Sequence, residues 1–533
     1  MKHNYFSFKL YKEALSQLSL PGFLSAGILL AAVLLQGWSE IVHSFSRSEF
    51  STWTPSIAEA WIPTMLYVWT APFLFGLLLF NFLNSRKKSD YYHALTARRE
   101  TLILSFAAAI YTWLIATVAL ALALGAMLFS FAGAELTGTQ LSSAVLSFFP
   151  SILYAVAVTL LAMSLSGTLF TNLVLGNLLL WMPLLVSSLF SEGVSSLVPA
   201  LPYGEASFFG LSLGVTLFGD MLLVTEFTWG GEWTFASGLA NAAWTIFLAV
   251  AMFAAAVFFF VRRKSEMAGN SASSSRMQAL YRVAVALPPL MVAAVFAPLD
   301  ILRFGGGSPQ AGIENAFAVV ATMIIALLLI ATFELISTKT WRNLLKVPLS
   351  FGIALLLAIV FAGFVWAVAA YEANFTPRAE NIVWVGIPKD FDTNRWHINS
   401  ATSRGLKSPD VNEPWRGDEA LRTIFNDELR ISDEYLAQAM AAALVEVRDE
   451  VAWIPTGSNA RSTETPTSSY WSTDSSKLRN ESLVFEIRTT SGMTKRRTLT
   501  YAETGTLAGT DRSNDRFIVP NQLGEAIANL DLR

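Results

Sequence analysis

Charged and aromatic side chains, which carry much of the binding chemistry of proteins, concentrate in one short segment of this chain. Residues 84–100 read NSRKKSDYYHALTARRE and hold five of the 37 lysine and arginine residues, with two tyrosines and a histidine. Long apolar runs lie on both sides of the segment. Cations pair with lipid headgroups or with acids of a partner, and tyrosines supply contact area with a polar tip. The segment is therefore the first candidate for a functional site.

Residues for catalysis or metal binding are scarce elsewhere in the sequence. Cysteine is absent, which excludes disulfides, thiolate catalysis and cysteine-ligated metals, and the four histidines lie far apart. No GxxxxGK[ST], GxSxG or HExxH motif occurs. We expect no catalytic residue, no metal and no cofactor site on this chain. An enzyme would need a pair of acids near the C-terminus, for which the candidates are Asp390, Asp392, Asp433 and Glu434.

The composition is that of a membrane protein. Of the 533 residues, 53% are hydrophobic and 14% are charged, whereas soluble domains have about 25% charged residues. The net charge of −3 gives no indication of a nucleic-acid partner. Nine runs reach the length that a spanning helix needs: 21–38, 61–83, 102–131, 145–164, 168–190, 237–261, 283–302, 315–337 and 347–370. The predicted fold class is a polytopic α-helical membrane protein with a C-terminal extracytoplasmic α+β domain.

The basic residues predict the orientation of the chain in the membrane. With the N-terminus in the cytoplasm, the cytoplasmic segments hold sixteen lysine and arginine residues, and the opposite loops hold only Arg47 and Arg303. The 84–100 segment is then cytoplasmic and residues 371–533 are extracytoplasmic. An extra span within the glycine-interrupted stretch 205–225 would reverse the position of the tail. We interpret that stretch as a re-entrant or surface segment.

The N-terminal residues before the first span have a helical pattern of their own. From Phe8 to Leu18, apolar residues recur at three- and four-residue spacing with charged residues between them. Residues 1–20 are therefore predicted to form an amphipathic helix in the membrane interface, and Pro21–Gly22 to break it from the first span. The alternative is a continuous extension of that span.

Composition divides the rest of the chain into further domains. Residues 21–261 are predicted to form a six-span core and residues 283–370 three additional spans. Between them, the serine-rich segment 262–282 is predicted to be a flexible linker. Residues 371–533 form a separate domain, because they hold most of the acids and no apolar run of spanning length.

Two local patterns in residues 371–533 predict its secondary structure. A capped amphipathic helix is expected after Ser432, with Leu436, Met440, Leu444 and Val447 on one face. The stretches SLVFEIRT and KRRTLTY flank TSGMT, which is typical of a β-hairpin.

The spans contain almost no ionisable residues. Such residues usually mark proton or ion relays, so we expect the energy for any transport to come from another source. Glu334 lies near the end of the eighth span. We expect it to form an ion pair at the membrane interface with Lys339 or Arg342, which follow it in the segment TKTWRNLLK.

The order of these elements resembles the permease subunits of ABC-2 type exporters. An amphipathic helix, a span, an outer loop and a second span precede the 84–100 segment and a third span. Within that group the chain resembles the bacterial branch that has extra spans and an extracytoplasmic C-terminal domain, and FELISTKTWRNLLK at 333–346 resembles the end of the eighth span of that branch. The resemblance implies an ATP-driven export subunit in a bacterial plasma membrane. It implies no cofactor on this chain, because a partner subunit binds the ATP.

The same resemblance implies a role for the 84–100 segment. In such permeases this loop forms a short coupling helix that docks into a cleft of a separate ATPase subunit. Ser89 or Asp90 would cap the helix, and Tyr91 and Leu95 would share one face of it. The residues expected at this contact are Asp90, Tyr91, Tyr92, His93, Leu95, Arg98 and Arg99. The alternative is that the charges only orient the chain in the membrane.

Three functions stay open at this point. The first is the exporter permease, which would assemble with an ABC ATPase and with a second permease chain, identical or not, in the lipid bilayer. Its pathway would lie between the permease chains and hold few polar groups, among them Ser164, Ser166, Asn172 and Asn177. The second is a membrane sensor whose extracytoplasmic domain binds a ligand. The third is a membrane-anchored enzyme that works through the tail.

Overall fold

A computed structural model describes residues 5–45, 61–94, 98–131, 138–198, 201, 235–304, 309–388, 421, 423–450, 480–502 and 522–530. The chain divides into two compact units. The first comprises Met1–Leu189, Phe208–Ala294 and Ala316–Phe361, and the second comprises Phe190–Ser207, Val295–Asn315 and Ala362–Arg533. Leu95, Asp390, Asp392 and the stretch 205–225 lie outside the described residues.

Nine helices in the described ranges are long and apolar enough to cross a membrane. Each overlaps one of the nine apolar runs, so the predicted class of polytopic α-helical membrane protein is confirmed. In chain order they are α1 (Phe8–Phe45), α3 (Ile62–Phe80), α5 (Arg99–Phe131), α6 (Gly138–Leu165), α7 (Leu169–Leu197), α9 (Phe235–Arg262), α10 (Ser275–Phe304), α11 (Pro309–Thr338) and α12 (Val347–Ala373).

The predicted break at Pro21–Gly22 is wrong, because α1 continues through both residues. Pro21 has no amide hydrogen to donate to the carbonyl four residues earlier, and membrane helices tolerate proline at such positions. Gly22 serves a packing role instead. A Cβ atom there would lie 2.8 Å from the Trp113 ring on α5, so the glycine allows the two helices to approach closely.

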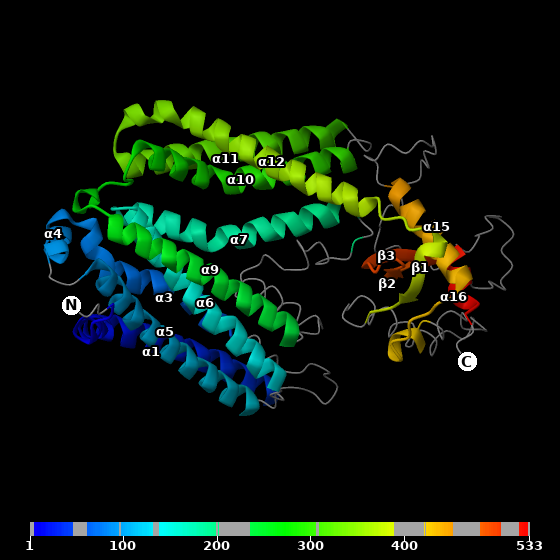
Figure 1. The fold of residues 1–533 in the computed structure, drawn as a ribbon, viewed down its shortest axis with the longest axis horizontal. Coiled ribbons are helices and arrows are strands. Elements are labelled where there is room, and N and C mark those ends of the chain that lie inside the picture. Colours follow the sequence, from blue (N-terminus) through cyan, green and yellow to red (C-terminus); the bar gives the residue numbers. More distant parts are fainter. Residues whose placement is uncertain are drawn as a thin grey trace. The chain divides into compact units, whose positions relative to one another are not determined.

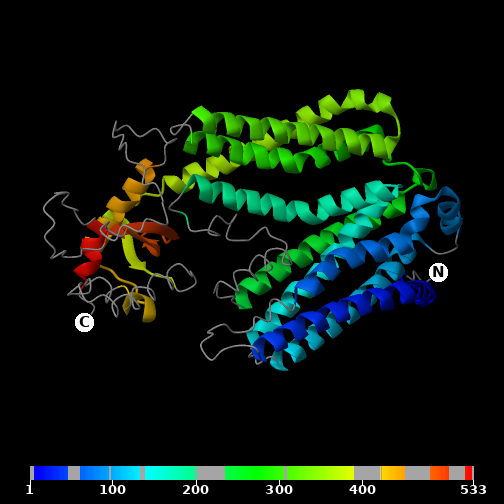
Figure 2. The same ribbon diagram turned by 180° about the vertical axis from the view of Figure 1, so that it is seen from behind.

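The helices of the first unit pack around α6. This helix contacts α3, α5 and α9, and α1 lies along α3 and α5, so that these five helices run side by side (Figures 1 and 2). Gly76 on α3 and Thr159 on α6 mark one close crossing, since a Cβ on Gly76 would lie 2.5 Å from the Thr159 methyl group. The buried Tyr154 hydroxyl on α6 donates to the Leu179 carbonyl of α7 over 2.7 Å. Its polar group is therefore satisfied within the apolar core.

Short elements connect these helices at one end of the bundle: η1 (Asn81–Asn84), α4 (Arg86–Ala94), η3 (Ser265–Met267) and η4 (Trp341–Lys346). The segment 262–282 was predicted to be a flexible linker, but it is tied to the turn between α6 and α7. The Gly167 amide donates to the Asn270 carbonyl at 2.9 Å, and the Gly269 amide donates to the Gly167 carbonyl at 2.8 Å. Residues 262–282 belong to the first unit, together with the helices on both sides of them up to Ala294.

The second unit contains a three-stranded antiparallel sheet of β1 (Ile382–Gly386), β2 (Asn480–Thr489) and β3 (Thr494–Ala502), in the order β1-β2-β3. The hairpin predicted around TSGMT is confirmed. Its turn closes with a hydrogen bond from the Thr489 amide to the Met493 carbonyl, 2.8 Å long. Gly492 in that turn has a φ of +83°, a conformation that glycine adopts without steric cost.

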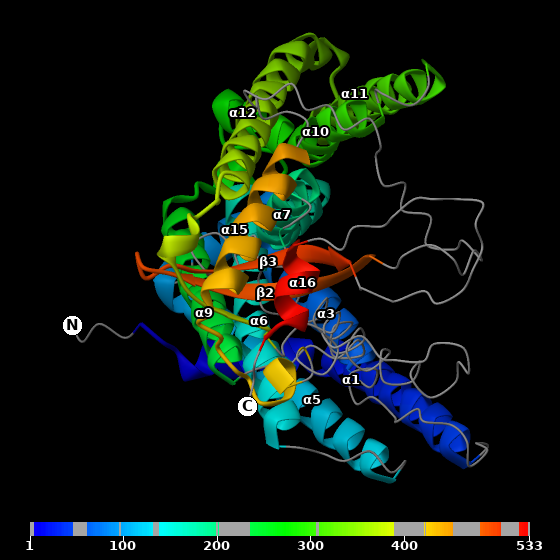
Figure 3. The same cartoon turned by 90° about the vertical axis from the view of Figure 1, so that its right-hand side faces the viewer.

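Two helices lie beside this sheet, α15 (Glu434–Glu450) and α16 (Gln522–Ala528) (Figure 3). The predicted amphipathic helix is α15, and Leu436, Met440 and Leu444 are buried against the sheet. The side chain of Val447 lies outside the described residues. Asp433 rather than Ser432 caps the helix, because its carboxylate accepts a hydrogen bond from the Leu436 amide at 2.7 Å.

Candidate functional site

The segment that the sequence singles out lies where several helix ends meet. We call this region the α4 end: it comprises η1, α4, the first turn of α5, the 166–168 turn and residues 261–274 (Figure 1). All of these belong to the first unit. Hydrogen bonds from two arginine side chains hold the helix ends together here.

Arg263 is the central residue of the α4 end. Only 2% of its surface is exposed. Its guanidinium donates to the carbonyls of Met163, of Ser166 at 2.6 Å and of Leu83 at 2.8 Å. These carbonyls close α6 and η1, where no backbone donor is available and the helix dipole is negative. One side chain therefore joins the ends of three elements.

The positive charge of Arg263 persists at neutral pH. Burial lowers the pKa of its guanidinium to about 10, which is still well above 7. From the sequence, Arg263 was predicted only to be one of the sixteen cytoplasmic basic residues that orient the chain. Its acceptors, Leu83 and Met163, are far away along the chain, so no local pattern could reveal this role.

Arg99 has a similar role at the first turn of α5. Its guanidinium donates to the carbonyl of Val261 at 2.8 Å, in the last turn of α9, and to that of Arg263 at 2.6 Å, directly after the helix. Arg99 was expected to contact a partner protein. In the structure, the Arg99 side chain joins α5 to α9 within the chain. Arg98 is exposed beside it.

A chain of polar side chains continues from Arg263 toward α4. The Ser166 hydroxyl donates to Asn172 Oδ1 at 2.5 Å, and the Asn172 amide donates to Asn84 Oδ1 at 3.0 Å. Ser166 and Asn172 are fully buried within this chain. They were expected on the wall of a pathway between two chains, and in the structure both side chains lie inside the first unit. Asn177 is exposed, and its amide donates to the Leu173 carbonyl of its own helix.

The helix α4 begins one turn earlier than expected. Arg86 is its first residue, so Ser89 and Asp90 lie inside the helix and cap nothing. The Ser89 amide donates to the Ser85 carbonyl at 2.8 Å, and the Ser89 side chain is fully buried. Ser89 is therefore on the face of α4 that rests on the helix bundle.

The two tyrosines of α4 have different surroundings. Tyr92 stacks on Phe82 with ring centroids 4.2 Å apart, and its ring lies 6.4 Å from that of Phe106 on α5. It was expected to face a partner, but it anchors α4 to its own bundle. Tyr91 is 65% exposed. His93 belongs to the helix, but its side chain is outside the described part of the structure.

The outer face of α4 presents a compact mixed surface. Its exposed residues are Arg86, Lys87, Lys88, Asp90 and Tyr91. An aromatic ring surrounded by charges is suited to contact with a protein surface or with headgroups rather than to catalysis. Within the described ranges, no group of three or more His, Asp or Glu side chains is placed to hold a metal ion. Asp433, one of the acids considered for catalysis, is the cap of α15.

The ion pair predicted for Glu334 has a different partner. Glu334 is 1% exposed, and Arg282 of α10 lies 3.4 Å from its carboxylate. The Gln278 amide donates to the same carboxylate at 2.7 Å. Lys339 and Arg342, the predicted partners, are exposed. A buried carboxylate is stabilised only by a cation that is buried beside it. Arg282 meets this requirement, because it is only 4% exposed.

Comparison with known proteins adds no relationship. No family model, no curated protein and no solved structure matches this chain.

Proposed function

We propose that this chain is the membrane subunit of an ATP-driven ABC-2 type exporter and that α4 is its docking element for a separate ATPase subunit. The observation that carries the proposal is the geometry of α4. It is a short helix between two candidate spans, with one face fastened to the bundle and the other exposed. An exposed tyrosine among charges on a rigid support is typical of an interface anchor.

The connections of the α4 end supply a path for mechanical coupling. Leu83, directly before α4, accepts from Arg263, which also holds the end of α6. Arg99, after α4, holds the end of α9. A displacement of α4 by a nucleotide-driven ATPase would therefore move α6 and α9 together. Discrete hydrogen-bonded contacts of this kind transmit motion between packed elements.

The proposal includes the orientation and the assembly. The α4 end lies in the cytoplasm and the C-terminal domain outside a bacterial plasma membrane, in keeping with the positive-inside rule. The chain is not itself an enzyme, and ATP is bound and hydrolysed by the partner. A second permease chain, identical or related, completes the pathway, whose apolar walls suit an amphipathic cargo such as a peptide, an antibiotic or a lipid.

Affinity purification tests this function. The tagged full-length chain is extracted from its own membranes in mild detergent, and the co-purifying chains are identified by mass spectrometry. The proposal expects a stoichiometric chain with a P-loop motif and ATP hydrolysis in the purified complex. Purification of the chain alone, or with a partner that has no ATPase motif, would contradict it.

A membrane sensor is the second candidate, and one feature of the second unit favours it. The Glu372 carboxylate at the end of α12 accepts from Lys495 at 2.6 Å and from Arg497 at 2.7 Å, both on β3. The Arg497 guanidinium also lies 5.0 Å from the centroid of the Phe375 ring. We call these four residues the α12 clamp. Ligand binding by the sheet domain would pass through it to a membrane helix, and a partner without ATPase activity would support this function.

A further inference from the structure

The connection between α11 and α12 is short, exposed and mixed in composition. It consists of residues 339–346, which include η4, and we call it the η4 segment. Two large apolar side chains are open here: Trp341 is 72% exposed and Leu345 is 87% exposed. No residue of η4 is buried. The segment also has three exposed cations, Lys339, Arg342 and Lys346.

The lengths of the neighbouring helices place the η4 segment at a membrane surface. The helix α11 has 30 residues and α12 has 27. At 1.5 Å per residue they are about 45 and 40 Å long, whereas the hydrocarbon core of a bilayer is about 30 Å thick. Each helix can therefore cross the membrane without the segment that joins them. Since its charged side chains would be costly in the hydrocarbon, the η4 segment lies at the level of the headgroups.

The cations of the η4 segment have no acid of the chain beside them. Between Leu335 and Tyr371 the sequence contains neither Asp nor Glu. Glu334 comes directly before this stretch, but it is buried and already paired with Arg282. Within the described residues, none of the three cations forms an ion pair. Three uncompensated positive charges at headgroup level attract anionic lipids.

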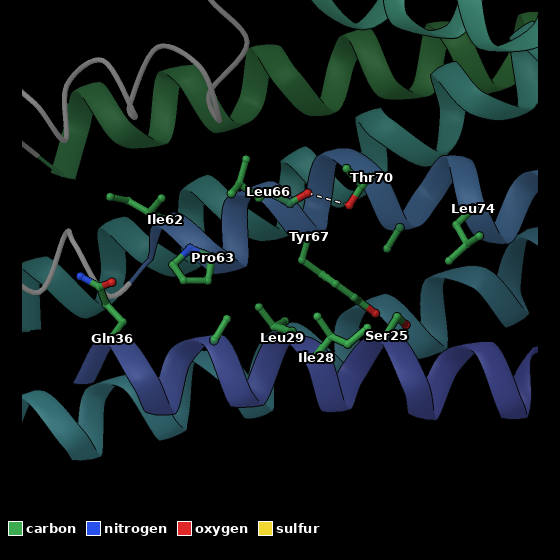
Figure 4. A pocket seen from close by; sticks show the side chains of 12 residues that line it. Ser25, Ile28, Leu29, Gln36, Ile62, Pro63, Leu66, Tyr67, Thr70 and Leu74 are labelled. Carbon is green, nitrogen blue, oxygen red and sulfur yellow. Dashed lines mark hydrogen bonds between the residues drawn. The ribbon is translucent and has the colours of Figure 1, made fainter. Parts of the chain in front are cut away.

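The charge distinguishes the η4 segment from the apolar groove between α1 and α3. Figure 4 shows that groove, and none of its lining residues is charged. Ile28 and Leu66 on its walls are exposed on candidate membrane spans. Acyl chains therefore reach these walls irrespective of the headgroup that they carry. The groove walls are an internal reference, because they contact lipid without selecting its charge.

We propose that the η4 segment binds the headgroups of anionic phospholipids and inserts Trp341 and Leu345 at the boundary between headgroups and acyl chains. Tryptophan is enriched at this boundary because its ring is apolar and its N–H is polar. The guanidinium of Arg342 can bind a phosphate with two parallel hydrogen bonds. The stems of the lysines can lie along apolar surface while their ammonium groups reach the phosphates.

The backbone at Lys339 allows the charge to be tested separately from the fold. Lys339 has a φ of +54°, a left-handed conformation that glycine adopts without steric cost and lysine does not. Its amide donates to the Leu335 carbonyl at 2.9 Å, which closes the end of α11. Glycine at this position keeps that hydrogen bond, relieves the backbone and removes the positive charge.

Photocross-linking with two lipids tests the proposal. The full-length chain is reconstituted in phosphatidylcholine nanodiscs that contain a small amount of either phosphatidylglycerol or phosphatidylcholine with the same diazirine in one acyl chain. Labelled peptides are mapped by mass spectrometry. We expect peptides that cover residues 339–349 to be labelled at least about fivefold more by phosphatidylglycerol, which is the effect of one cation at an anionic surface. Peptides of the groove walls, residues 25–36 and 62–74, should be labelled equally by both lipids.

Two variants and a control show which charges select the lipid. Arg342→Gln is expected to lower the ratio of phosphatidylglycerol to phosphatidylcholine label on residues 339–349 by about fivefold. Lys339→Gly should lower the ratio to a similar extent without lowering the midpoint of thermal unfolding, a combination that damage to the fold would not produce. Lys264→Gln is the matched control and should leave the ratio unchanged, because it removes an exposed cation outside the segment.

Equal labelling of residues 339–349 by the two lipids would overturn the proposal. The same ratio in Arg342→Gln and Lys264→Gln would overturn it too, since the selection would then not depend on the η4 segment. Absence of label from both lipids, as a second copy or another protein seated on η4 would cause, would also contradict it.

Discussion

At the scale of single residues, the α4 end depends on one buried guanidinium. Arg263 has lost nearly all contact with water, and hydrogen bonds to three carbonyls, in α6, in the turn after it and in η1, compensate for this loss. Such a group stabilises the fold only while all its acceptors are in place. Any change that removes the donor leaves buried carbonyls unpaired.

Replacing Arg263 should therefore be severe. We expect Arg263→Ala to lower the free energy of unfolding by about 3 kcal/mol, since hydrogen bonds from charged donors contribute about 1.5–3 kcal/mol each. Lys264→Ala is the control, because Lys264 is adjacent and exposed. Thermal unfolding in detergent gives the comparison. Equal midpoints for the two variants would show that the capping interactions contribute nothing measurable.

Which residues pair could not be read from local sequence. Glu334 was assigned to Lys339 or Arg342 because they follow it closely, whereas its cation is Arg282, on a different helix. The acceptors of Arg99 and Arg263 could not be predicted for the same reason, because they lie more than 90 residues away along the chain. Charge patterns predict which side of a membrane a residue is on, and tertiary packing decides its partner.

At the scale of elements, prediction succeeded where the signal is local. Apolar run length predicted the nine candidate membrane helices of the described ranges, and alternation with a glycine turn predicted the hairpin of β2 and β3. The prediction of a break at Pro21 is wrong because a proline does not by itself end a membrane helix, and Gly22 lets α1 pack closely on Trp113 of α5. The segment 84–100 was correctly predicted to contain a helix. Which face of this helix is exposed was not predicted, because the stacking of Tyr92 on Phe82 determines that face.

The α12 clamp leads to a prediction at this scale. Arg497 is buried, and Lys495 and Glu372 are mostly buried beside it. Glu372→Gln therefore removes the negative charge that pairs with both cations. Amide hydrogen exchange of β3 and of the last turn of α12 should become faster, because the tie between them weakens. Glu380→Gln is the control, since its pair with Arg378 is exposed and contributes little. Unchanged exchange in Glu372→Gln would show that the clamp does not hold these elements.

At the scale of the whole molecule, the orientation in the membrane is open to a direct measurement. The absence of native cysteine allows single substitutions to be labelled with an impermeant thiol reagent in intact cells. We expect no labelling of Ser273→Cys, near the α4 end, and strong labelling of Ser491→Cys, in the turn between β2 and β3. Both positions are exposed, whereas Ser89 is buried and unsuited to the test. The reverse pattern would place α4 outside and exclude its contact with a cytoplasmic ATPase.

The central claim is that the exposed face of α4 binds an ATPase subunit, and Tyr91→Asp tests it most directly. Tyr91 is 65% exposed, so the change should leave the fold intact while it removes an aromatic anchor and adds a charge. Tyr435→Asp is the matched control, because Tyr435 is an exposed tyrosine of the C-terminal domain. The measurement is the amount of ATPase chain that co-purifies with each variant.

We expect Tyr91→Asp to weaken the complex by about 2 kcal/mol or more, roughly a 30-fold loss of affinity, so that the ATPase is lost on purification. Tyr435→Asp should retain the ATPase at the level of the unchanged protein. Full retention of the ATPase by Tyr91→Asp would contradict the claim that α4 is the docking element.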